Sequence, residues 1–345
     1  MSAVMTNLDA TYPEGSQSFP REQRDLLVDF LKRFGERCVG YSTLQPGLEY
    51  FIDEEKGYIA YQSFRHPVLA LTGRKMILSN PVCDPADYRA ITQAFLAQHP
   101  KAIFLQVDQH YASVLEGMGL QVNCFGIETE LPIDGFSLDG KLRSKLRQWR
   151  NKCQREQVVV EHCKISDVDP AEIRSLSDAW LKNRSGREFT LLMRPFQGRD
   201  EEDVYFLTAR QRGELIGMTS FDPIYRNKKI VGYYHNLDRI CAQAPHGTSA
   251  FCVLEAIKQF AEAEIEYVSL GFSPLYGLQE QYRHSRVARF SLGFAYEHLN
   301  FLYPFKGNAV HKKKFGGVAK PVYLSSTQGN SIRELLSIIK TLKLL

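Results

Sequence analysis

The sequence predicts an α/β fold, of the mixed α+β kind, built as two lobes joined by a basic helix. Its 345 residues suffice for two domains of about 150 residues each. Helical and strand patterns alternate in a similar order in both halves, and a strongly basic segment separates the halves. We therefore expect a first lobe over residues 1–137, a connector over 138–160 and a second lobe over 161–345.

The first half begins with a predicted helix and an antiparallel meander. Phe19–Gly35 has apolar residues at helical spacing and ends in a glycine. Short aromatic or β-branched segments separated by turn residues predict strands at Tyr50–Ile52, Tyr58–Phe64, Val68–Leu71 and Lys75–Leu78. The remaining predicted elements are helix Asp84–Gln98, which has a proline at its first position, strand Ala102–Val107, helix Gln109–Gly117 and strand Gly126–Leu131.

The second half follows the same order of elements without a residue-by-residue repeat. Its predicted elements are helix Pro170–Arg184, strands near Tyr205–Arg210, Glu214–Pro223 and Ile230–Leu237, helix Thr248–Glu264, strand Tyr267–Leu270, a helix near Leu278–Phe290, and late strands near Phe301 and Val322.

The connector, Leu138–Gln157, is predicted to be an amphipathic basic helix. It carries seven basic residues against two acidic ones, and helical spacing aligns one apolar stripe: Leu142, Leu146, Trp149 and Cys153. Such a helix packs through its stripe and leaves a charged face in solvent. Because neutralising carboxylates are nearly absent, the face is also a candidate anion-binding surface. Its candidate phosphate contacts are Lys141, Arg143, Lys145, Arg147 and Arg150.

Composition limits the other classes of function. The net charge of +4 is modest, so attraction to nucleic acid or membrane must come from local patches. Seven scattered cysteines form no CxxC pair and no histidines stand at metal spacing, so we expect reduced thiols and no metal site. No stretch approaches the roughly twenty apolar residues that span a bilayer. We expect a cytoplasmic protein with no integral membrane segment, and binding to an anionic membrane surface stays open.

The last quarter of the chain holds two motifs that together predict an anion site. Gly271–Leu275 (GFSPL) indicates a turn leaving an apolar strand, and His311–Phe315 (HKKKF) places three lysines between aromatic rings. In an extended segment Lys312 and Lys314 point to one face and, with Lys313, would clamp a phosphate. A solvated basic loop is the alternative.

The turn itself supplies candidate substrate contacts. Gly271, Ser273 and Pro274 end a strand at its carboxyl edge, where open α/β sheets place their ligands. Turning the chain is their simplest alternative role.

A second candidate site precedes a predicted helix at Pro245–Ser249 (PHGTS). The amides of Gly247, Thr248 and Ser249 would lie at the helix N-terminus, which favours an anion or oxyanion. The hydroxyls can instead cap the helix. His246 is a candidate general base, although a loop histidine is often structural.

Three arginines complete the candidate site. Arg239 follows a predicted strand and would reach a substrate carbonyl or phosphate, while Arg283 and Arg286 would extend the basic surface. Salt bridges to Glu280 or Glu297 are the ordinary alternative.

Taken together, these segments resemble the C-terminal synthase domain of lysylphosphatidylglycerol synthetases, the cytosolic part of the multiple peptide resistance factors. The resemblance extends over most of the chain. It lies in the order and spacing of Phe136–Arg155, Trp180, Phe189, Gly217–Pro223, Leu237–Arg239, His246 with Gly247, the GFSPL segment and the HKKKF lysines.

The chain departs from that family's pattern at three points. Ala250 or Phe251 stands where the family usually has an aspartate, His311 replaces the first phenylalanine of the final motif, and the transmembrane flippase half is missing from the sequence.

The resemblance implies two tandem acetyltransferase-like (GNAT) lobes and transfer of an aminoacyl group from aminoacyl-tRNA to a lipid hydroxyl, without a metal or cofactor. It implies a phosphatidylglycerol-like acceptor at an anionic membrane surface. Lys312 and Lys314 would bind the tRNA end and stabilise charge, and the basic helix would contact tRNA phosphate. The candidate catalytic group is Lys312, Lys314, Arg239, His246 and Ser249.

Three other functions stay open. An acyltransferase would use acyl-CoA or acyl carrier protein, although CAQAPHGTSAF has one glycine where a pyrophosphate-binding loop needs more. A peptidoglycan-type aminoacyltransferase would use the same tRNA donor with another acceptor. A non-catalytic module would use the basic surface to bind nucleic acid or membrane.

Overall fold

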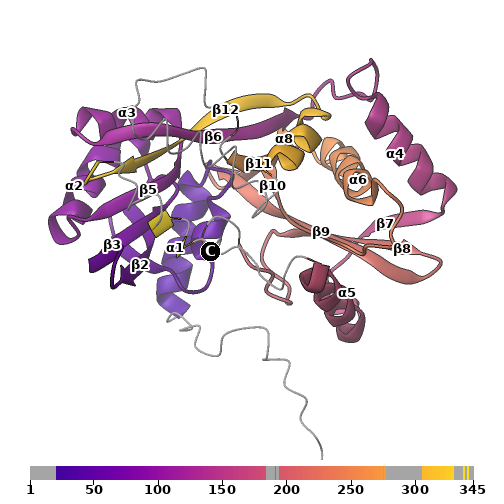
Figure 1. Cartoon of the computed structure of the whole chain (residues 1–345), viewed down its shortest axis with the longest axis horizontal. Helices are drawn as coiled ribbons and strands as arrows, with labels where there is room; N and C mark the ends of the chain where they lie inside the picture. The colour runs from indigo at the N-terminus through magenta and orange to yellow at the C-terminus, as the bar shows by residue number, and fades with distance from the viewer. Residues whose placement is uncertain are drawn as a thin grey trace, which may run out of the picture.

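Both halves of the chain contribute to a single twisted sheet, seen in the computed structural model of Figure 1. The structure describes residues 21–183, 191, 194–274, 276, 305–329, 337–338 and 340–341. The strands lie in the order β1-β2-β3-β5-β12-β6-β11-β10-β9-β8-β7, and β4 pairs with β2.

The bounds of these strands are β1 Glu49–Asp53, β2 Gly57–His66, β3 Ala70–Leu78, β4 Val82–Cys83, β5 Ala102–Val107, β6 Gln121–Pro132, β7 Val158–His162, β8 Tyr205–Gln211, β9 Glu214–Arg226, β10 Lys229–Ile240, β11 Tyr267–Pro274 and β12 Val318–Ser326.

The described helices are α1 Arg21–Phe34, α2 Tyr88–Gln98, α3 Gln109–Gly117, α4 Ser144–Arg155, α5 Pro170–Asn183, α6 Thr248–Glu262 and α8 Phe305–Lys313, with short 3-10 turns at Tyr41–Leu44, Pro85–Asp87 and Ile165–Asp167.

Each half contains one parallel strand pair that a helix connects. β3 and β5 are parallel with α2 between them in the chain, and β10 and β11 are parallel with α6 between them. A parallel pair requires a crossover, and a helix that covers the sheet is its usual form. The other strand pairs in the described part of the chain are antiparallel. This repeated unit is the alternation of strands and helices that the sequence predicts in both halves.

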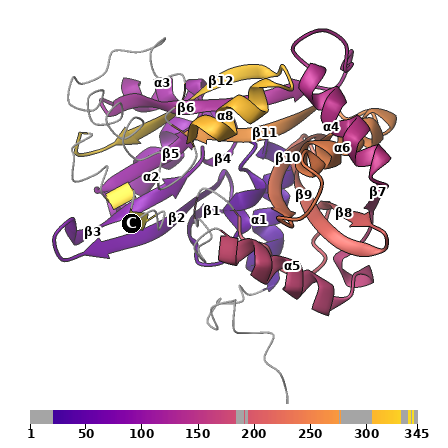
Figure 2. The ribbon, with the colours of Figure 1, turned by 45° about the vertical axis from the view of Figure 1, so that its right-hand side comes forward.

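Three strands link the two halves at the centre of the sheet. β12 comes from the end of the chain but lies between β5 and β6, pairing antiparallel with both. β6 then pairs with β11 of the second half. Figure 2 shows β12 and β6 running together across the top of the molecule. Division of the chain at residues 137 and 160 therefore stays a prediction, because the sheet itself has no break there.

Most predicted elements are confirmed, two of them to the residue: β5 and α3. The predicted break between Val68–Leu71 and Lys75–Leu78 is wrong, since β3 runs without a break from Ala70 to Leu78, while Val68 and Leu69 lie in the turn before it. Gly73, at φ +76°, lies on this continuous strand, and a register shift against β2 falls between Phe64 and His66. β3 therefore continues through a local irregularity in its pairing with β2 and does not end in a turn there. The helix predicted near 278–290 and the strand near Phe301 lie outside the described residues.

The connector helix packs through only part of its predicted stripe. Leu146 and Trp149 lie in one buried cluster with α6 residues such as Val253, and Cys153 is also buried. The prediction for Leu142 is wrong: it precedes the first residue of α4, Ser144, and its side chain is 56% exposed. α4 thus lies against α6 on one side, as Figure 1 shows, and its charged face is open.

Candidate active site

Lys312 is buried where α8 meets β11. Its Nζ donates a hydrogen bond to the main-chain oxygen of Phe272 over 2.8 Å, and only 9% of the residue is exposed. This contact brings together the two motifs that the sequence singles out in the last quarter of the chain. Among the HKKKF lysines, this contact with the GFSPL segment is made by Lys312.

The local structure of both motifs differs from the prediction. Gly271–Pro274 is not a turn: β11 continues through Pro274 and pairs with β6 as far as Gly126. HKKKF is not extended, because α8 runs through Lys313. Successive helical side chains point in different directions, so Lys312 and Lys314 do not share a face as they would in a strand. The lysines therefore have separate environments.

Gly271 has a conformational reason to be glycine. Its φ is +78°, and an added Cβ would lie 2.5 Å from a ring carbon of Tyr234. A register shift against β6 falls between Ser269 and Gly271. Two residues on, Ser273 is buried and its Oγ has no hydrogen-bond partner among the described residues. Pro274 is half-buried at the end of the strand.

A buried polar group lies beside the Lys312 amine. Glu128 accepts hydrogen bonds from Arg37 Nη2 at 3.2 Å and from Ser269 Oγ at 3.0 Å. Burial lowers the pKa of Lys312 to about 7, and the nearby Cys38 and Glu128 act in the opposite direction. Burial also raises the pKa of the Cys38 thiol, which keeps it protonated. Lys312 is therefore an amine that changes charge near neutral pH.

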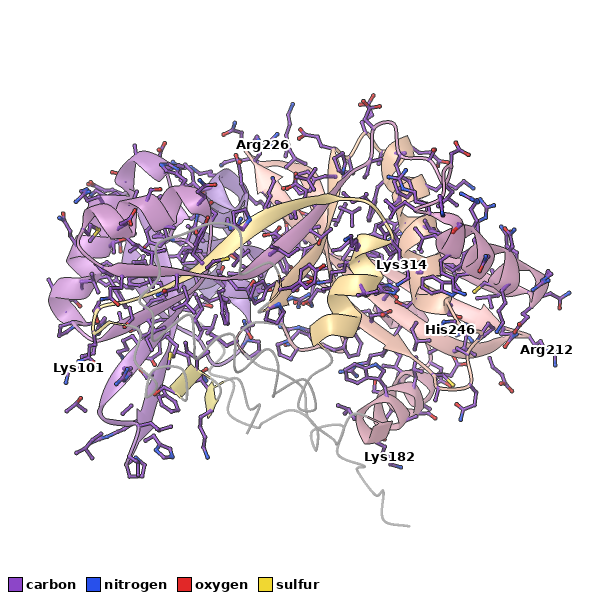
Figure 3. The ribbon with its side chains drawn as sticks, turned by 45° about the horizontal axis from the view of Figure 1, so that its top comes forward. Lys101, Lys182, Arg212, Arg226, His246 and Lys314 are labelled. Atoms are coloured by element: carbon purple, nitrogen blue, oxygen red, sulfur yellow. The ribbon has the colours of Figure 1, made fainter. Side chains whose placement is uncertain are left out.

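Trp149 is the centre of a second cluster, formed by α4, α8 and the loop before α6. The ring of His311 stacks on it at 5.7 Å between centroids, and the ring of His246 meets it edge-on at 5.4 Å. The ammonium groups of Lys314 and Lys145 lie 5.6 and 5.9 Å from its centroid, within cation–π range. Figure 3 labels Lys314 and His246 in this region.

The two histidines of this cluster differ in burial. Burial lowers the pKa of His311 to about 4, while Asp238 opposes that shift. The His311 imidazole is therefore neutral at pH 7. His246 is exposed, which leaves it open to solvent beside the same indole.

The N-terminus of α6 is arranged around Gly247, whose φ is +104°. An added Cβ there would lie 2.4 Å from Trp149 Cβ and Cγ, so the indole covers this position. The Thr248 hydroxyl donates to the Pro245 oxygen at 2.7 Å, and the Ser249 hydroxyl donates to Asp238 Oδ2 at 2.6 Å. Neither bond is to an amide of the first helical turn, so the predicted capping role is not what these hydroxyls do.

Asp238 is a site residue that the residue-by-residue analysis missed. Its carboxylate on β10 accepts from Ser249 and, at 3.4 Å, from Thr219, and it is the acidic group that acts on His311 and His235. Its signal in the sequence was its place inside Leu237–Arg239, where only the arginine received a role.

Arg239 does not lie with these groups. It is buried, and its guanidinium packs over the rings of Trp180 and Phe196 at 5.4 and 5.0 Å. This environment gives Arg239 a packing role in the second half of the chain. Arg283 and Arg286 lie outside the described residues.

The candidate phosphate contacts of the basic helix divide into two groups. Arg143 and Arg147 turn back on the chain: Arg143 Nε donates to the Phe315 oxygen at 3.0 Å, and Arg147 donates to the oxygens of Leu138 and Gly140. These two arginines fix the loop ahead of α4 and the end of HKKKF. The remaining cations, Lys141, Lys145, Arg150 and the neighbouring Lys313, are exposed or half-buried.

Two features are absent from the described part of the chain. No group of three or more His, Cys, Asp or Glu side chains gathers there as a metal ion would need. None of the helices described is both long and apolar enough to cross a bilayer.

Solved structures show which fold this is. The chain is similar to the structure of L-PGS from Bacillus licheniformis, with a TM-score of 0.75 and 19% identity over 92% of this chain and 95% of that one. It is also similar to the C-terminal domain of a putative lysylphosphatidylglycerol synthetase from Agrobacterium fabrum, with a TM-score of 0.71 and 21% identity over the same shares. The predicted α/β fold class is therefore confirmed.

A family model described as "Phosphatidylglycerol lysyltransferase, C-terminal" matches residues 28–325, and the chain belongs to this family. Among curated proteins, it is 24% identical to a phosphatidylglycerol lysyltransferase of Staphylococcus aureus (strain MRSA252) over 90% of this chain and 36% of that protein. It is 22% identical to that of Bacillus subtilis (strain 168) over 78% of this chain and 32% of that protein. The chain thus spans about a third of the length of these relatives. The resemblance stated from the sequence is confirmed.

Proposed function

We propose that this protein is an aminoacyltransferase that moves an aminoacyl group from aminoacyl-tRNA to a hydroxyl of phosphatidylglycerol or a similar anionic lipid, at the cytoplasmic face of a membrane. Family membership and the names of its relatives support the lipid acceptor. The observation that carries the proposal is the buried Lys312 amine on the Phe272 oxygen, with a pKa of about 7.

The reaction requires one group that can take up and return a proton. The lipid hydroxyl oxygen attacks the carbonyl carbon of the aminoacyl ester, and its proton passes to a base. The tetrahedral intermediate then collapses, the bond to the ribose oxygen breaks, and that oxygen receives a proton. A group with a pKa near the working pH performs both steps well, and neutral Lys312 becomes an ammonium in between.

The Trp149 cluster would hold the charged parts of the donor. In this proposal the ammonium of Lys314 stabilises the oxyanion of the intermediate, and the exposed cations Lys141, Lys145 and Lys313 contact tRNA phosphates. The Ser249 hydroxyl and the Asp238 carboxylate fix the N-terminal turn of α6. His246, exposed beside Trp149, is a second candidate for proton transfer. Exchange of one ester for another needs no redox group.

The test uses the purified chain, a pool of aminoacyl-tRNA labelled in the amino acid, and phosphatidylglycerol vesicles. Label is expected in the lipid extract, and Lys312→Ala is expected to lower the rate by about 10² to 10⁴. Lys258→Ala, which removes an exposed lysine of α6 that has no role in the proposed site, is the matched control and should keep the wild-type rate.

Two outcomes would overturn the proposal. If no label reaches lipid from any aminoacyl-tRNA, the lipid acceptor is wrong. If label reaches an acceptor from acyl-CoA or acyl carrier protein but not from tRNA, the donor is wrong. The covering of Gly247 by Trp149 gives the acyl-CoA alternative no support, because a pyrophosphate needs that helix N-terminus open.

A further inference from the structure

The hairpin formed by β2 and β3 projects from the first half of the sheet and ends in exposed apolar side chains. Figure 2 shows it as an arm at the far left of the molecule. Val68 at its tip is 72% exposed and Leu71 is 67% exposed, and they are the two most exposed large apolar residues in the described part of the chain. Pro67 beside them is exposed as well. Isolated exposed apolar residues are ordinary, but a cluster at the end of an arm indicates a contact surface.

The charge around this tip has one sign. Between Gly57 and Val82 the chain has no aspartate or glutamate, while it has Arg65, Arg74 and Lys75. Lys101 comes to the same arm from outside it, since its Nζ donates to Thr72 Oγ1 at 2.7 Å; Figure 3 labels Lys101 there. Glu49, which lies outside this segment, pairs with Lys75 over 3.4 Å towards the base of the arm. Apolar side chains among cations match a surface with anionic headgroups over an apolar interior.

The main-chain amides at the tip also need no hydrogen bonds from water. Pro67 has no N–H, and the amides of Val68 and Leu69 both donate to Nδ1 of His66 at 3.2 Å. Three successive tip residues therefore present no N–H that needs water. An unsatisfied amide is costly in a lipid environment, so this arrangement suits a lipid surface better than a solvated turn requires.

From these three observations we infer that the tip of the β2–β3 hairpin is the segment with which the protein docks on an anionic lipid surface. Val68 and Leu71 enter the interface, and Arg65, Arg74 and Lys101 lie at the headgroups. The inference rests on the proposed function in one respect: a lipid acceptor gives such docking its purpose. The arm holds no residue of the candidate site.

The test measures binding alone, by sedimentation with vesicles in the absence of tRNA. The full chain is expected to bind vesicles of equal parts phosphatidylglycerol and phosphatidylcholine, and to bind phosphatidylcholine vesicles weakly. The double variant Val68→Asp/Leu71→Asp is expected to lose about tenfold or more in partition to the anionic vesicles. Val159→Asp is the matched control, because it changes an exposed valine on β7 of the other half and should bind like the wild type.

The outcomes separate this inference from the proposed function. Equal binding by the double variant and the wild type overturns the docking role, whether or not aminoacyl transfer occurs. A tip that instead holds a second copy of the chain would make the wild type dimeric and the double variant monomeric in sedimentation velocity, which also overturns it. If the tip carries vesicle binding but no label reaches lipid, only the proposed reaction fails. With a short-chain, monomeric phosphatidylglycerol as acceptor, the double variant should transfer at the wild-type rate.

Discussion

Lys312 Nζ and the main-chain oxygen of Phe272 are joined by a hydrogen bond of 2.8 Å, although forty positions separate the two residues. Because Phe272 belongs to β11, which pairs with β6, the bond fixes α8 to the strands that both halves of the molecule share. The amine is thereby held away from water beside Glu128. The burial that suits Lys312 to proton transfer also destabilises its charged form in the folded protein.

Replacing Lys312 by methionine is expected to change how stability depends on pH. Burial lowers the pKa of Lys312 from 10.5 to about 7, so between these values the unfolded chain binds a proton that the native chain does not. Wild-type stability therefore rises with pH through this window, and the variant lacks the effect. The stability of Lys312→Met relative to the wild type should fall by about 2 to 4 kcal/mol from pH 7 to about pH 10. Urea unfolding at both pH values checks this; a constant difference would contradict it.

His311→Phe is expected to remove an acid sensitivity of the fold. Burial lowers the pKa of His311 from 6.5 to about 4, although Asp238 faces it, and Lys312, Lys314 and His235 act with the burial. The unfolded chain therefore takes up a proton between these values that the native chain refuses, so stability is lost as pH falls through the window.

Phenylalanine keeps an aromatic ring on Trp149 but cannot titrate. The wild type should lose about 1 to 3 kcal/mol more than His311→Phe between pH 7 and about pH 4.5, measured by urea midpoints. His246→Phe, at the exposed edge of the same indole, is the control and should lose as much as the wild type.

Gly247→Ala is expected to destabilise the protein for two separable reasons. Its φ of +104° disfavours any side chain, and the new Cβ would lie 2.4 Å from Trp149. Gly213→Ala is matched for the first reason only, since its φ is +88° and nothing lies within 4 Å of the added Cβ. We expect Gly247→Ala to cost about 1 to 3 kcal/mol more than Gly213→Ala in thermal or urea unfolding. Equal costs would show that Trp149 moves aside freely.

Asp222→Ala is expected to destabilise far more than the loss of a surface ion pair. Asp222 accepts two hydrogen bonds from Arg194, at 3.0 and 2.6 Å, and both residues are buried. Removing the carboxylate leaves Nε and Nη2 of the buried guanidinium without their acceptor, while Nη1 keeps its contact with Glu201, at a cost of about 3 kcal/mol. Glu172→Ala breaks a similar two-point contact with Arg210, but these side chains are about a third exposed, so the cost should stay below about 1 kcal/mol.

The fold was predictable where local signals are strong. β5 and α3 follow each other with clear boundaries, because a fully buried apolar run gives way to Asp108, which caps the helix by accepting from the Tyr111 amide. The GFSPL and HKKKF segments were harder. Proline and serine usually end a strand, and a run of three lysines beside a glycine pair reads as a loop. Pairing with β6 and packing on β11 override both preferences.

The sequence predicts only part of the candidate site, because tertiary contacts decide the rest. Lys312 was singled out, but as a phosphate clamp in an extended segment, and only tertiary contact shows that its amine is buried on the Phe272 oxygen. Trp149 was placed in a packing stripe, which is correct, while its contacts with His311 and Lys314 come from a helix that lies far along the chain. No periodicity within α4 can reveal such a partner. Asp238 is recognised as a site residue only in the folded structure, because its contact partner Ser249 lies on the neighbouring helix α6.

The position of β12 determines how late in synthesis the sheet can be completed. β5 and β6 are complete once residue 132 is made, yet the strand that lies between them is not translated until residues 318–326. Until then both strands carry open edges, which are prone to pair with other chains. The native strand order of the first half therefore cannot be completed before the second half has been translated.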